Sequence, residues 1–146
     1  MSSTQVPRPF PTDQTQVARY RAFPETAAGF ALPTSASSDR HFFFSLPGAI
    51  ALPAVIYWRT RRFGKPAFSV RLNDATLTQY TFVDGDEAER TWHEIIPANT
   101  PAGPTLRSDN NELVFFARDG SVGFGDVVIL YTSSQTTVPG SALPMA

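Results

Sequence analysis

The chain has 146 residues, of which 42% are hydrophobic and 17% charged, a length and composition suited to one domain with a single core. Its 12 basic and 13 acidic residues leave a net charge of -1, which gives no electrostatic reason to bind nucleic acid or an anionic membrane. The absence of cysteine excludes disulfides, thiol catalysis and cysteine-ligated metal centres.

Residues 1–38 are rich in Pro, Ser, Thr and Gln, a composition that predicts an extended arm. The arm also carries spaced apolar side chains, namely Phe10, Tyr20, Phe23, Phe30 and Leu32. It either packs back on its own domain or docks on a neighbouring subunit. The first ten residues lack the apolar core of a signal peptide, and the apolar stretch 46–58 is too short to cross a membrane. We therefore expect a soluble protein, and the compartment stays open between the cytoplasm and export by a non-Sec route.

A series of strands is predicted over residues 39–134. Runs of β-forming residues occupy 41–46, 54–62, 68–72, 76–83, 91–96, 112–118 and 122–131. Turn pairs separate them at Pro47-Gly48, Asn73-Asp74 and Asp119-Gly120. Because no amphipathic helix interrupts the strands, we expect an all-β fold, an antiparallel β-sandwich (jelly roll), followed by a flexible tail over 135–146.

Asp126 stands inside the apolar strand 122–131, where an unpaired charge would be costly. Gly123 and Gly125 favour a β-bulge there, in which Asp126 bonds to backbone amides or to an arginine. A contact to a ligand or a metal at the edge of the sandwich is the alternative.

Three parts of the strand series resemble galactose-binding-like jelly rolls, a group that includes many carbohydrate-binding modules. They are the strand 68–73, the strand 91–97, and the pair of segments 110–115 and 122–129. The resemblance covers about residues 65–132, and it implies that Leu113 and Phe115 lie in the core and that an asparagine ahead of Leu113 closes a turn with its side chain. The acidic N-terminal strand that helps to hold calcium in several such families is missing, so we expect no cofactor. Calcium capture by the acidic loop 84–89 stays as an alternative.

The residue types needed for catalysis are sparse. The two histidines are His41 and His93, and the pair His93-Glu94 lacks the second histidine of a zinc motif. Adjacent strand residues also point to opposite faces. No serine occupies a G-x-S-x-G turn, and the carboxylates of residues 84–89 lie in one loop instead of facing each other across a cleft. We expect no enzymatic activity.

Aromatic residues beside arginines and asparagines are the candidates for ligand binding, because sugar C–H faces stack on aromatic rings and polar side chains bond to the hydroxyls. Tyr57, Arg59 and Arg61 share one face of a strand, while Trp92 is either a core residue or an exposed platform. The candidate set is Trp92, His93, Tyr57, Arg59, Arg61 and Asn73.

Two functions remain open. The first is a non-enzymatic, lectin-like module that binds a glycan. The second is a structural subunit of a homo-oligomeric filament, capsid or tail-like assembly that uses its N-terminal arm for subunit contacts. The expected partner is accordingly a glycan or further copies of the chain, and neither nucleic acid nor a membrane.

Overall fold

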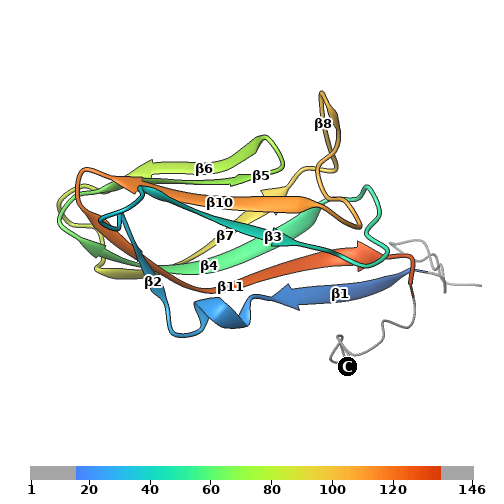
Figure 1. The fold of residues 1–146 in the computed structure, drawn as a ribbon, viewed down its shortest axis with the longest axis horizontal. Coiled ribbons are helices and arrows are strands. Elements are labelled where there is room, and N and C mark those ends of the chain that lie inside the picture. The colour runs from blue at the N-terminus through green and yellow to red at the C-terminus, as the bar shows by residue number, and fades with distance from the viewer. Residues whose placement is uncertain (1–15, 136–146) are drawn as a thin grey trace, which may run out of the picture.

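The computed structural model describes residues 16–135 and shows an antiparallel β-sandwich of two layers (Figure 1). Sheet A has the order β1 (Val17–Ala22), β11 (Ser121–Ser133), β4 (Ala54–Phe63) and β7 (Glu89–Ile96), with β2 (Phe30–Leu32) also paired to β11. Sheet B has the order β3 (Asp39–Phe44), β10 (Asn111–Arg118), β5 (Ala67–Leu72) and β6 (Ala75–Thr81). The 3-10 helix η1 (Pro24–Thr26) and a projecting hairpin of β8 (Asn99–Thr100) and β9 (Gly103–Pro104) complete the fold.

The predicted fold class is confirmed, and each of the seven strands expected after residue 39 is present. From β3 onward the chain changes sheet at almost every connection, as in a jelly roll. The two turn pairs at residues 73–74 and 119–120 have the left-handed backbone that such residues tolerate, with φ of 45° at Asn73, 70° at Asp74 and 60° at Asp119.

The structure corrects the predicted boundary at residue 39, because the described part of the arm belongs to the sandwich. Strand β1 pairs with β11 from Val17 to Ala22, and β2 pairs with β11 as well. Phe23 and Leu32 are only 3% and 1% exposed. These residues therefore pack on their own domain. Residues 1–15, which include Phe10, and the tail 136–146 lie outside the described residues.

An aromatic core joins the two sheets. Trp58 and Trp92 of sheet A stack with ring centroids 6.0 Å apart, and Phe68 of sheet B meets Trp92 edge-on at 5.1 Å. Leu113 and Phe115 are fully buried, as the resemblance implied. Since side chains alternate across a strand, burying these residues turns their sequence neighbours to the outer faces.

Candidate functional site

The outer face of sheet A carries four of the six candidate residues. Strand β4 buries Ile56, Trp58 and Thr60, and turns Tyr57, Arg59 and Arg61 outward as predicted. Strand β7 adds His93, which is paired in register with Tyr57, and the two rings lie 6.3 Å apart at an angle of 39°.

A depression of about 450 Å³ hollows this face at the Arg59–Arg61 end. Gly123 and Gly125 of β11 line it without side chains, and residues 27–31, which run from the end of η1 into β2, line it as well. A Cβ at Gly125 would lie only 3.3 Å from the carbonyl oxygen of Thr26, so glycine allows the connection to approach the strand closely. Phe63, which is 52% exposed, also lines the depression.

Two arginine–carboxylate pairs border the depression. Arg59 donates from Nη1 to Oδ2 of Asp126 at 3.2 Å, and Arg61 Nε lies 3.9 Å from Oε1 of Glu89. Asp126 stands in a β-bulge between Gly125 and Val128 with φ of 51°, so the interpretation of a bulge with an arginine partner is confirmed. All four side chains are at least half exposed, which makes each pair worth about 1 kcal/mol or less.

Trp92 lies elsewhere, inside the core. It is 6% exposed, and its Nε1 donates to Oγ1 of Thr60 at 2.8 Å. Trp58 stacks on one side of the ring, and the guanidinium of Arg90 lies 3.7 Å from the ring centroid. Of the two alternatives for Trp92, the structure supports the core position, so the ring offers no free face on which a sugar could stack.

Asn73 is also buried, at 8% exposure, and holds two loops together. Its Nδ2 donates to the carbonyl of Thr105 at 2.6 Å and to Oδ1 of Asn111 at 2.7 Å, while its Oδ1 accepts from the amide of Glu112 at 2.8 Å. Asn111 in turn bonds to the backbone of Arg107 in both directions. Asn73 thus positions loops at one end of sheet B, away from the depression.

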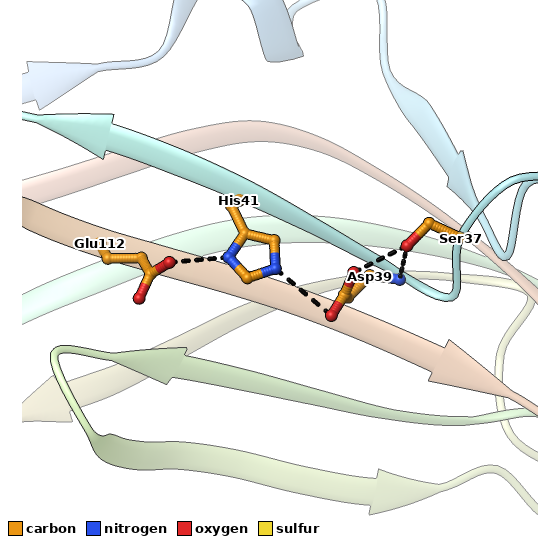
Figure 2. A network of polar contacts seen from close by, with 4 residues as sticks. All are labelled: Ser37, Asp39, His41 and Glu112. Atoms are coloured by element: carbon orange, nitrogen blue, oxygen red, sulfur yellow. Dashed lines mark hydrogen bonds and ion pairs between the residues drawn. The ribbon is translucent and has the colours of Figure 1, made fainter.

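Sheet B carries a polar network that the sequence did not predict (Figure 2). His41 bonds through Nδ1 to Oε2 of Glu112 at 2.7 Å, and its Nε2 lies 3.3 Å from Oδ2 of Asp39. The bond to Glu112 is the main cause that raises the pKa of His41 above 6.5, and the Ser37 hydroxyl is the main cause that lowers the pKa of Asp39 below 3.8. Ser37 donates to Asp39 at 2.7 Å and not to His41, so the four residues lack the serine–histidine contact that activates a nucleophile.

The carboxylates of the acidic loop have separate partners. Asp86 accepts from the hydroxyl of Tyr80 and the amide of Val83, and Asp84 lies 3.6 Å from Nζ of Lys65. Among residues 16–135, no three His, Cys, Asp or Glu side chains are grouped so as to hold a metal ion. Within the same residues no helix is long and apolar enough to cross a bilayer.

Comparison with known proteins finds similarity to solved structures. No family model matches the chain, and no curated protein matches it. The C-terminal carbohydrate-binding module (CBM6) of LamC, a marine laminarinase from Zobellia galactanivorans, is similar over 80% of this chain and 98% of that chain, with 9% identity and a TM-score of 0.41. The likeness concerns the sandwich alone and does not specify a ligand.

Proposed function

We propose that the protein is a non-enzymatic carbohydrate-binding module, and that its site is the outer face of sheet A from Phe63 to Tyr57. One observation carries the proposal. Exposed aromatic rings flank two exposed arginine–carboxylate pairs, beside a depression that glycines keep open. A binding site typically combines apolar surface with a few placed polar groups, and this face provides both.

The chemistry of the face matches that of a sugar. A hydroxyl group both donates and accepts, so neighbouring hydroxyls suit a guanidinium that donates beside a carboxylate that accepts. The pairs Arg59–Asp126 and Arg61–Glu89 repeat that arrangement along β4. Tyr57 and Phe63 lie about 20 Å apart along the strand, a length that accommodates several sugar rings in a row.

Glycan-array screening followed by calorimetry of the selected glycan tests the proposal. We expect Arg59→Ala to weaken binding about tenfold or more, because it removes charge-assisted hydrogen bonds. The matched control is Arg118→Ala on sheet B, where the arginine is 66% exposed and forms a similar 3.8 Å pair with Asp119. Unchanged thermal stability in both variants assigns the effect to binding. A folded protein that ignores every glycan, or equal losses in both variants, contradicts the proposal.

A further inference from the structure

The two arginines of the proposed site differ in how fully they are engaged. The guanidinium of Arg59 makes a hydrogen bond to Asp126 at 3.2 Å. That of Arg61 has no hydrogen bond to any residue within 16–135, and Glu89 approaches it only to 3.9 Å. Arg61 is 64% exposed and Glu89 61%, so water surrounds both members of this pair. The donors of Arg61 are thus available to a ligand at little cost.

Arg61 is nevertheless held in place. Its guanidinium carbon lies 5.5 Å from the centroid of the Phe63 ring, and both side chains line the depression. Gly123 stands opposite Arg61 in the register between β11 and β4, and it adds no side chain that could block approach to the guanidinium. The Phe63 ring thus positions the guanidinium, and a ligand can approach it over Gly123. A planar guanidinium suits a carboxylate, which accepts two parallel hydrogen bonds from it.

We propose that the site selects uronic acids, which are sugars that carry a carboxylate, and that Arg61 determines this specificity by binding the ligand carboxylate in place of Glu89. The inference rests on the proposed function, since it names the class of sugar that the face of sheet A takes. Arg59 stays paired with Asp126 and supplies the neighbouring hydroxyl contacts.

Glu89 would then compete with the ligand carboxylate for Arg61, and this competition can be tested directly. Glu89 carries the same charge and the same functional group as the ligand and borders the same depression. Removing its charge should therefore increase the preference of the site for a uronate over the neutral, carboxyl-reduced form of the same sugar. Removing Arg61 should have the opposite effect on the uronate.

The experiment compares trisaccharides of galacturonate, mannuronate and glucuronate with their carboxyl-reduced counterparts by calorimetry at low salt. We expect at least one uronate to bind about tenfold more tightly than its reduced form, with Arg61→Gln abolishing that preference. Glu89→Gln should increase the preference several-fold, whereas the control Asp119→Asn, at the 3.8 Å pair of sheet B, should not. Added salt should weaken the uronate complex selectively.

The outcomes separate the two proposals. If neutral sugars bind as well as uronates, or if Glu89→Gln leaves the preference for uronates unchanged, the specificity inference is overturned and carbohydrate binding stands. If neither the trisaccharides nor the glycans of an array bind to the folded protein, carbohydrate binding itself falls.

Discussion

Asn111 is a fully buried amide that ties the loops at one end of sheet B together, and replacing it by alanine measures how much that end depends on it. Its Nδ2 donates to the carbonyls of Phe44 at 3.3 Å and Arg107 at 2.6 Å, and its Oδ1 accepts from Asn73 Nδ2 at 2.7 Å and the Arg107 amide at 3.0 Å. A net value of about 0.5–1.5 kcal/mol per hydrogen bond gives a loss of about 2–6 kcal/mol for Asn111→Ala. That is a large part of the roughly 5–15 kcal/mol that stabilises a typical domain.

Urea denaturation followed by tryptophan fluorescence is the suitable assay, because Trp58 and Trp92 are both in the core. The matched control is Asn99→Ala, an exposed asparagine in β8, which should change the free energy of unfolding by about 0.5 kcal/mol or less. If Asn111→Ala lowers the free energy of unfolding by no more than the control does, then these four hydrogen bonds do not hold the loops, and the reasoning fails.

Two further predictions concern the core indole and the network on sheet B. Trp92→Phe should lower the free energy of unfolding by about 1–3 kcal/mol, because it leaves the buried Thr60 hydroxyl without its indole donor; unchanged urea stability would argue against the core position. The raised pKa of His41 means that the contacts of its imidazolium stabilise the fold in full below pH 6.5 and lose that effect as the pH rises through the raised value. Between pH 5 and pH 8, the midpoint of urea unfolding should therefore fall more in the native protein than in the His41→Gln variant. If the two midpoints change in parallel with pH, the imidazolium of His41 does not stabilise the fold.

The strands after residue 39 could be predicted because their signals are local. Alternating polarity, flanking turn pairs and β-forming residues all lie within a few positions of one another. The same alternation places Tyr57, Arg59 and Arg61 on one face, which the structure confirms. Strands β1 and β2 could not be found in this way, because both pair with β11 near the other end of the chain, and their partner is not visible in a short window of sequence.

The alternation of side chains along a strand does not predict burial when both faces of the strand have similar polarity. In β7 the buried Trp92 shares its face with Arg90, while Ile95 on the opposite face is 67% exposed. The polarity of neither face identifies it as the core side, so the burial of Trp92 depends on Trp58 and Thr60 of the adjacent strand. The contact between His41 and Glu112 was equally hidden, since 71 residues separate the two.

The bulge in β11 shows how one local irregularity can serve both the fold and the proposed site. Before it, the buried residues of the strand are Val122 and Phe124, and after it they are Val127 and Ile129, so the inward side changes from even to odd positions. The side-chain period of a regular strand is two, so without an irregularity Val127 and Ile129 would point to the face opposite Val122 and Phe124. One extra residue in the bulge restores the burial of the later half of the strand.

The bulge also shapes the proposed site. It leaves Asp126 outside the core, where its side chain reaches Arg59, while Gly125 before it keeps the depression open. The requirement to bury both halves of β11 therefore also places a carboxylate beside an arginine at the surface where we propose that a sugar binds.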